Sequence, residues 1–287
     1  MIARHCICCD SERLARSPAI LMPFVAARAF GWEPVCVEPE WGLRDLQSGM
    51  AYPLCSSVLC SECGTLFLDI RFSDDEMAAL YADYRGDAYT TMRNRFEPGY
   101  AARNALLTAG VDYIPAVEAF LAPFVPSRPQ VLDWGGDTGR NTPFLRNAAK
   151  LHVFDISTAK PVSGAQPVTR DQIERDAYDL VVFSNVLEHI PEPLRALRDI
   201  HDAVGTHPIV YLEVPHEDLM RSGVADAQTR KRHWHEHVNF FSERGVARLL
   251  ARAGFHILAQ REFEVDVGGK HAYQLGLVVR SEQSSAR

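Results

Sequence analysis

The chain has 287 residues and a formal net charge of −7 at pH 7. This length suits an α/β domain with a smaller accessory domain, and the acidic balance gives no general affinity for nucleic acid or an anionic membrane. The most apolar stretch, residues 18–30, is interrupted by Pro23 and Arg28 and is too short to span a bilayer. We therefore expect a cytoplasmic protein without a signal sequence, a monomer or homodimer whose partner is a small molecule.

Seven cysteines in a reducing compartment suit metal binding or burial better than disulfides. Two C-x-x-C pairs supply the four thiolates of a structural zinc (Zn²⁺) site: Cys6, Cys9, Cys60 and Cys63. His5 or Cys55 could replace one ligand, and ordinary buried cysteines are the alternative interpretation. The intervening segment shows few regular periods. Residues 1–72 are therefore predicted to be a small, irregular zinc-binding domain that the metal holds together.

Residues 73–127 are predicted to form a helical linker or lid. Ser73 and Glu76 have the spacing of a capping box, so a helix should begin there. The polar residues 85–99 are expected to loop over the cofactor or acceptor site, and residues 101–124 show the spacing of one or two helices that lean on a sheet. Three tyrosines are candidates for that site, with simple packing as the alternative: Tyr81, Tyr84 and Tyr89.

The chain is organised around residues 131–139, where a short apolar run ends in Asp133 and breaks into glycines. This pattern predicts a strand, a tight turn and then a helix near Pro143. Glycines permit positive φ angles and let the backbone approach a ligand, and the N–H groups at the start of a helix point toward it. A strand-to-helix turn with no ligand is the alternative.

Two further predicted strands run into polar residues, one at residues 151–154 and one within residues 178–190, ahead of Asn185. Residues 151–154 lead to Asp155, about twenty residues beyond the first strand, where nucleotide-binding α/β folds place the acid that binds ribose hydroxyls. A helix cap is the other role open to Asp155. Because ligands of open α/β sheets bind at the carboxyl ends of strands, six residues are expected to line a cofactor: Asp133, Gly135, Gly136, Gly139, Asp155 and Asn185.

These motifs resemble those of class I S-adenosylmethionine (SAM)-dependent methyltransferases, which carry a VLDxGxGxG turn, an acid after the second strand and a DLVxxxxVLEHxxxP segment. The similarity continues through residues 209–215 and 237–242. It implies SAM as the cofactor and an α/β fold over residues 128–281, a Rossmann-like seven-stranded methyltransferase sheet with an antiparallel last strand. Asp137 replaces the middle glycine of the family's turn and would face the amino acid end of the cofactor.

The densest group of titratable residues is the run His-Trp-His-Glu-His at 233–237. It follows the fifth predicted strand, so it should lie at the same edge as the cofactor. The run resembles the YHEHxxxFS segment of nucleotide-sugar C-methyltransferases, which also begin with a CxxC…CxxC zinc domain and continue into a large C-terminal domain beyond the point where this sequence ends. That resemblance implies acceptor activation by Glu236 and His237, with Trp234 in place of the tyrosine. A second metal on the alternating histidines is an alternative, although no further acidic ligand is in register.

The sequence therefore predicts a SAM-dependent methyltransferase acting on a small polar metabolite, with a sugar or nucleotide-sugar among the candidates. Asp137 joins the predicted cofactor-binding set, and three residues are predicted to be catalytic: His235, Glu236 and His237. One rival is a non-catalytic zinc-binding interaction protein with a degenerate methyltransferase domain, which Asp137 and Trp234 favour. Another is an NAD-dependent oxidoreductase, which the segment 187–189 opposes. Residues 282–287 are predicted to be a flexible tail.

Overall fold

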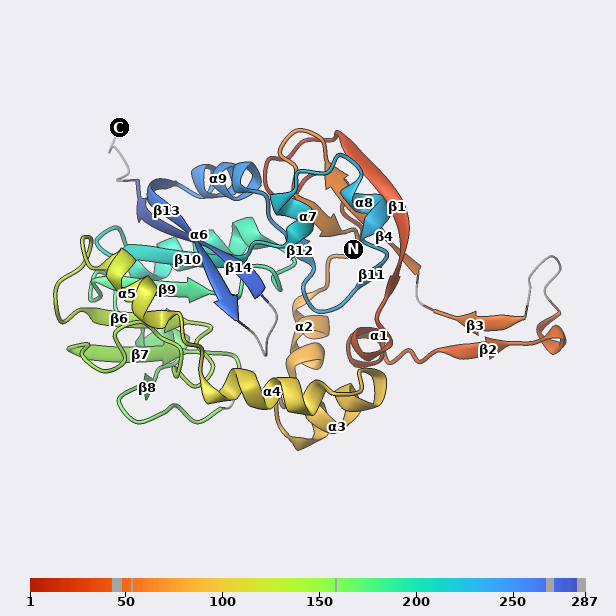
Figure 1. Cartoon of the computed structure of the whole chain (residues 1–287), viewed down its shortest axis with the longest axis horizontal. Coiled ribbons are helices and arrows are strands. Elements are labelled where there is room, and N and C mark those ends of the chain that lie inside the picture. The colour runs from red at the N-terminus through yellow and green to blue at the C-terminus, as the bar shows by residue number, and fades with distance from the viewer. Residues whose placement is uncertain (43–47, 53, 158, 267–270, 283–287) are drawn as a thin grey trace.

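A computed structural model describes residues 1–42, 48–52, 54–157, 159–266 and 271–282, so most of the predicted tail lies outside the described residues. Its larger sheet has seven strands in the order β13-β14-β10-β9-β6-β7-β8 (Figure 1). In chain order these strands are β6 (Gln130–Trp134), β7 (Lys150–Phe154), β8 (Gln166–Pro167), β9 (Leu180–Ser184), β10 (Ile209–Pro215), β13 (Phe255–Asp266) and β14 (His271–Ser281).

The directions of these strands confirm the predicted fold class. The central strands β6, β7, β9 and β10 run parallel, so their carboxyl ends meet at one edge. The last two strands pair as an antiparallel hairpin, and β14 lies antiparallel beside β10. Strand β9 is almost wholly buried, as expected of a parallel strand covered on both faces.

Helices cover both faces of this sheet. On one face α6 (Pro193–Val204) and α9 (Glu243–Arg252) pack on β9 and β10, and on the other α5 (Ile114–Leu121) packs on the same strands. Pro193 occupies the first turn of α6, and Gly205 follows its last residue. Ser242 caps α9 by accepting a hydrogen bond from the backbone N–H of Gly245 at 2.9 Å.

The predicted helix after the glycine turn is wrong. Residues 139–149 form a series of turns instead, and only the short η2 (Arg170–Gln172) separates β8 from β9. Phe144 adopts a left-handed conformation with φ 65°, and its N–H donates to the carboxylate of Glu118 in α5 at 2.6 Å. The apolar triplet 143–145 thus forms part of a turn. Over so short a run, the apolar pattern of a turn cannot be distinguished from that of a helix.

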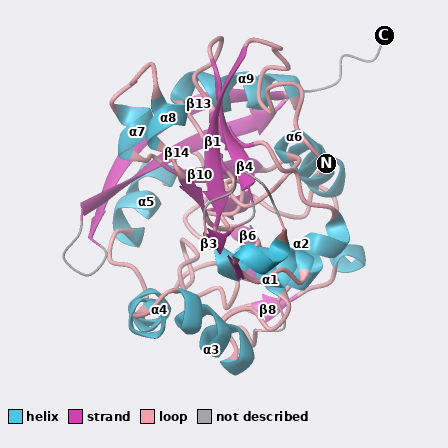
Figure 2. Ribbon diagram, turned by 90° about the vertical axis from the view of Figure 1, so that its right-hand side faces the viewer, coloured by secondary structure: helices cyan, strands magenta, loops and turns pink. Residues whose placement is uncertain are grey.

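The expected loop over residues 85–99 is also wrong, because it contains the helix α3 (Asp87–Phe96). This helix buries Tyr89 and Arg93 rather than an apolar stripe, so its sequence lacks the usual period. The neighbouring helices match the prediction, since α2 (Asp74–Tyr81) begins with the capping box of Ser73 and Glu76 and α4 (Tyr100–Ala109) precedes α5. Helix α2 lies side by side with α1 (Pro23–Phe30) (Figure 2).

The N-terminal part is more regular than predicted. A second sheet has five strands in the order β11-β1-β4-β5-β12. Its strands are β1 (Leu14–Leu21), β4 (Leu54–Cys60), β5 (Leu66–Leu68), β11 (His233–Trp234) and β12 (Asn239–Phe240). Between β1 and β4 the chain also forms η1 (Pro39–Trp41) and the hairpin of β2 (Val35–Val37) and β3 (Gly49–Ala51), which projects from the body (Figure 1).

Two strands of the second sheet, β11 and β12, come from the segment that follows β10, which also contains α7 (Asp218–Arg221) and α8 (Ala227–Arg230). Buried residues of both sheets share one core, in which Cys60 and Phe67 pack with Phe241 and Leu249. The sheets are therefore joined firmly, and the run 233–237 is held between them. Within the described part of the chain, no helix has both the length and the apolarity to cross a membrane.

Candidate active site and metal centre

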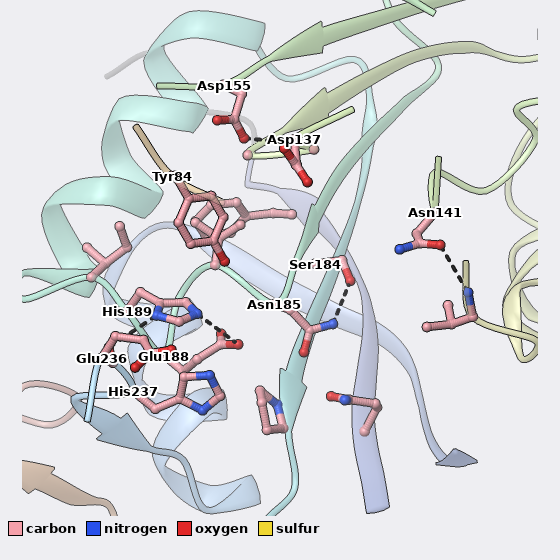
Figure 3. A pocket seen from close by; sticks show the side chains of 18 of the residues that line it. Tyr84, Asp137, Asn141, Asp155, Ser184, Asn185, Glu188, His189, Glu236 and His237 are labelled. Atoms are coloured by element: carbon pink, nitrogen blue, oxygen red, sulfur yellow. Dashed lines mark hydrogen bonds and ion pairs between the residues drawn. The ribbon is translucent and has the colours of Figure 1, made fainter. Parts of the chain in front are cut away.

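A cavity of about 720 Å³ lies at the carboxyl ends of β6, β7, β9 and β10, beneath α2 and α3. Its volume is within the range of ligand pockets, about 300–1,000 Å³. Figure 3 shows two groups of polar side chains in it, one around Asp137 and Asp155 and one around His189 and His237, with Tyr84 and Asn185 between them. All but one of the predicted cofactor and catalytic residues line this cavity: Asp133, Gly135, Gly136, Asp137, Asp155, Asn185, His235, Glu236 and His237.

The glycine turn forms one wall of the cavity. Gly135 has φ 82°, and a Cβ there would lie 2.5 Å from Val186, so no other residue fits. At Gly136 a Cβ would lie 2.4 Å from the carboxyl carbon of Asp133. Gly139 is not among the lining residues. Its φ of 72° and the 2.9 Å that would separate a Cβ from Val153 show that it serves the turn itself.

Three carboxyl groups surround this turn. Asp133 is buried and accepts a hydrogen bond from the hydroxyl of Thr142, and burial raises its pKa to about 7. Asp155, at the end of β7, accepts from the backbone N–H of Asp137 at 2.8 Å. Each oxygen of a carboxylate can accept a second hydrogen bond, so Asp155 keeps capacity for a ligand.

Asp137 is paired with Arg85, whose Nη1 donates to its Oδ2 at 2.9 Å. Burial raises the pKa of the Asp137 carboxyl despite the opposing charge of Arg85. The pair presents one negative and one positive group to the cavity. It is therefore suited to the ammonium and carboxylate of a free amino acid group.

A buried hydrogen-bond network fixes the middle of the cavity. Glu213 in β10 accepts from the hydroxyl of Tyr113 at 2.7 Å, the hydroxyl of Ser184 at 2.7 Å and the side-chain amide of Asn185 at 2.8 Å. Asn185 itself has φ 53°, a strained conformation that asparagine tolerates better than most residues. The network holds Asn185 at the end of β9, where it faces the cavity.

The far end of the cavity is built around His189 and His237, whose rings lie perpendicular with centroids 4.5 Å apart. Burial lowers the pKa of His189 to about 4 and the pKa of His237 well below its usual value, so both imidazoles are uncharged at neutral pH. Nδ1 of His189 lies 2.7 Å from the hydroxyl of Tyr81 and 3.1 Å from the carbonyl oxygen of Glu236. Burial raises the pKa of neighbouring Glu188 to about 8.

Glu236 is held as a carboxylate by Arg93. The Nη1 of Arg93 donates to its Oε1 at 2.5 Å, and the two side chains are 4% and 12% exposed. Burial alone would raise the pKa of Glu236, but the adjoining His235 imidazole and the Arg93 guanidinium together hold it well below its usual range. Glu236 is thus a fixed anion and a poor proton acceptor.

Trp234 does not reach the cavity. It is buried in β11, where its Nε1 donates to the hydroxyl of Ser57 at 2.7 Å and its ring stacks on Phe240. The phenol nearest the two histidines is instead Tyr81 from α2, one of the three tyrosines expected near the site. Arg85 and Arg93 were missed, because they lie in a stretch interpreted as a polar loop. Glu188 and His189 belong to the VLEH segment, whose match to the family pattern is the signal that could have marked them as site residues.

Four cysteines from the two C-x-x-C pairs converge beside β4 and β5. Their sulfur atoms all lie within 4.8 Å of one another, with Cys6 and Cys63 3.5 Å apart and Cys9 and Cys60 3.6 Å apart. Four thiolates around zinc at about 2.3 Å would be about 3.8 Å apart, so the set fits a tetrahedral ion. His5 and Cys55, the alternative ligands, do not belong to the group, and the predicted set is the one brought together.

The family comparison agrees with this arrangement. A family model described as a methyltransferase domain matches residues 108–260, more than half of the chain. No curated protein sequence matches. The chain belongs to this methyltransferase family, and its sheet order and glycine turn are those of the class I SAM-dependent fold.

Solved structures with a similar fold include three small-molecule or peptide methyltransferases. One is the 1,6-didemethyltoxoflavin-N1-methyltransferase of Burkholderia thailandensis, at 18% identity and a TM-score of 0.48, covering 69% of this chain and 90% of that one. A second is the glycopeptide N-methyltransferase MtfA, at 16% identity and a TM-score of 0.45, covering 63% of this chain and 97% of that one. A third is the magnesium protoporphyrin IX methyltransferase of Synechocystis PCC 6803, at 17% identity and a TM-score of 0.41, covering 57% of this chain and 81% of that one.

Proposed function

We propose that this protein transfers a methyl group from SAM to a small polar metabolite held at the histidine end of the cavity. One observation carries the proposal. The same cavity joins the glycine turn to a cluster with three buried side-chain atoms that have no hydrogen-bond partner in the described chain: Glu188 Oε2, Glu236 Oε2 and His237 Nδ1. Unpaired buried polar atoms are costly unless a ligand satisfies them.

The glycine-turn end has the groups that SAM requires. In this proposal Asp155 accepts from ribose hydroxyls, Asp137 accepts from the ammonium group, and Arg85 donates to the carboxylate of the methionine portion; all three line the cavity. Because Arg85 neutralises Asp137, an acidic residue in the turn need not repel the cofactor's carboxylate. SAM supplies a methyl group on a sulfonium, which an aligned acceptor takes by in-line displacement.

The histidine end has groups suited to an acceptor that loses a proton. His237 is an uncharged imidazole whose Nδ1 is unpaired, so it is the group we assign to contact the reacting atom. Glu236, fixed by Arg93, orients the cluster and balances positive charge that develops there. His235 accepts a hydrogen bond from the backbone N–H of His237 at 3.1 Å and so helps to set its position.

A sugar or nucleotide-sugar acceptor draws support from further polar groups of the cavity. Tyr84, Glu97 and Arg103 line it and offer both donors and acceptors for hydroxyl groups. Neither Asp137 nor Trp234 favours a degenerate domain once the chain is folded, because Asp137 pairs with Arg85 and Trp234 packs outside the cavity.

The cysteine group is proposed to hold a structural zinc. Four thiolates complete the tetrahedral coordination of a zinc ion and leave no open position for a substrate. None of the four cysteines lines the cavity. Arg252 of α9 donates to the carbonyl oxygen of Cys8 at 2.9 Å, and Ser242 contacts the carbonyl of Cys63. The metal would therefore stabilise the junction between the N-terminal module and the methyltransferase sheet.

A labelled-methyl screen tests the proposed function. Purified protein is incubated with methyl-labelled SAM and fractions of small polar metabolites, and label is followed into products. We expect label in a phosphate- or hydroxyl-rich fraction with wild-type protein, and about 10²- to 10⁴-fold less with His237→Ala, the loss typical of a missing acid–base group. Equal labelling by both proteins would contradict the assignment of the histidine end.

A further inference from the structure

We propose that Glu188, His189 and His237 form a second metal site, which holds a divalent transition-metal ion at the acceptor end of the cavity. One ligand atom from each of these residues lies within 4.8 Å of the other two. They come from two separate segments, the VLEH segment after β9 and the loop before β12, and meet in the cavity (Figure 3). This set differs from the alternating histidines 233, 235 and 237, because its carboxylate and one imidazole come from elsewhere in the chain.

The hydrogen bonding of His189 prepares it as a ligand. Its Nδ1 lies 3.1 Å from the carbonyl oxygen of Glu236, which can only accept, and 2.7 Å from the hydroxyl of Tyr81, which can accept or donate. In the tautomer that bonds the carbonyl, Nδ1 carries the hydrogen. The other nitrogen, Nε2, is then free to bind a metal, and it faces Glu188 at 3.8 Å from Oε1. An Nδ1–H group bonded to a backbone carbonyl is the arrangement that usually orients a metal-bound histidine.

The other two residues lack the partners that buried polar groups need. Glu188 is 1% exposed, and its Oε2 has no hydrogen-bond partner among the described residues. The Nδ1 of His237 is likewise without one. Burying a carboxylate without a partner is costly, and a bound cation removes that cost for Glu188 while it satisfies both imidazoles.

The donor set indicates which ion would bind. Imidazole nitrogens suit zinc and its neighbours, whereas magnesium and calcium prefer sites made of oxygen alone. Two histidines and one carboxylate leave an open position, as in catalytic zinc centres, and tetrahedral ligands would stand about 3.4 Å apart. The Nε2 of His189 and the Oε1 of Glu188, 3.8 Å apart, are already close to that spacing.

The role of this ion rests on the proposed function. In the open position it would bind an oxygen of the acceptor and lower the pKa of its hydroxyl, whose proton would pass to solvent before that oxygen takes the methyl group. It would thereby take over the part assigned to the His237 imidazole, and Tyr81 and Glu236 would position His189 beside it.

Cobalt binding tests the site directly. Protein whose cysteine group is already loaded with zinc is titrated with Co²⁺ and followed by equilibrium dialysis and visible absorption. Wild type should bind about one further ion per chain, with the spectrum of nitrogen and oxygen ligands and no thiolate band. Glu188→Gln and His237→Ala should weaken this binding at least about 100-fold. His271→Ala, which removes a histidine from the rim of the same cavity, should bind like wild type.

Absence of the further ion in wild type, or equal Co²⁺ binding by His237→Ala and wild type, would overturn the inference. The His237 side chain makes no hydrogen bond within the described structure, so this variant should fold even if Glu188→Gln does not. A parallel titration with SAM separates the two claims. Co²⁺ binding without SAM binding refutes the proposed function alone, and SAM binding without a further ion refutes only the metal site.

Discussion

Replacing Arg93 with methionine should lower the free energy of unfolding, because the change breaks the ion pair of Arg93 with Glu236. The change keeps an unbranched side chain against the rings of Tyr100 and Phe24, which the guanidinium now covers, but it removes the charge. Glu97 keeps Arg103 as a partner at 3.0 Å, whereas the 12% exposed Glu236 loses its guanidinium. Leaving one charge of a buried pair without its partner costs about 3–5 kcal/mol, and we expect Arg93→Met to lose that much unfolding free energy at pH 7.5.

The loss should depend on pH. In wild type the pKa of Glu236 is held well below its usual range, so the pair stabilises the fold above the unfolded glutamate value of about 4.3 and loses this effect as pH falls through the folded value. In Arg93→Met the guanidinium no longer lowers the pKa of Glu236, so burial raises the folded pKa above that of wild type although His235 remains. The destabilisation should then be largest at neutral pH and shrink as pH falls toward about 4.3.

Urea unfolding at several pH values measures this effect. Arg95→Met is the matched control. Arg95 lies on the same helix as Arg93 and pairs with Glu33, but the two side chains are 62% and 49% exposed, so the change should cost less than about 1 kcal/mol. The double variant Arg93→Met with Glu236→Gln should recover much of the loss. If Arg93→Met is no less stable than Arg95→Met, or equally destabilised at all pH values, the view of Glu236 as a fixed anion is wrong.

Three further results are expected. Asp155→Ala should weaken SAM by about 1.5–3 kcal/mol, or roughly 10- to 150-fold in calorimetric titration, because it removes hydrogen bonds to a charged acceptor; unchanged affinity would refute the ribose assignment. His237→Ala and Glu236→Gln should slow methyl transfer by about 10²- to 10⁴-fold while SAM affinity stays within a few fold, and full activity in both would contradict their place at the acceptor. Cys60→Ser with Cys63→Ser should lose the proposed zinc in elemental analysis and melt at lower temperature, whereas unchanged melting would exclude a structural role.

The sequence alone predicted the class of fold because several ordered signals agree on it. The glycine turn after β6, the acid after β7 and the final hairpin each have a local cause, and together they define one sheet. The predictions from sequence were wrong where contacts with distant parts of the chain, rather than the local residue pattern, decide the structure. Helix α3 buries Arg93 and Tyr89 through partners far away in the chain, so no apolar period marks it, and the triplet 143–145 is too short to distinguish a turn from a helix.

The sequence predicted individual residues of the candidate site better than it predicted which of them contact one another. Residues at strand ends could be named because parallel strands bring them to one edge, and the two C-x-x-C pairs carry their own spacing. Two features leave no local signal: the pairing of Glu236 with Arg93, 143 residues earlier, and the addition of β11 and β12 to the two edges of the N-terminal sheet. For the same reason Trp234 looked like a change in the chemistry, although it packs in a separate core.

Calorimetric titration with SAM is the most direct test of the central claim, that this cavity binds SAM for methyl transfer. Wild-type protein should bind about one SAM per chain with saturable heat below about 1 mM, and NAD should give none. Gly135→Ala should abolish this heat while the protein remains folded by circular dichroism, because its Cβ would meet Val186 and the backbone there has φ 82°. Saturable binding of NAD, or no heat from SAM up to about 1 mM, would contradict the account.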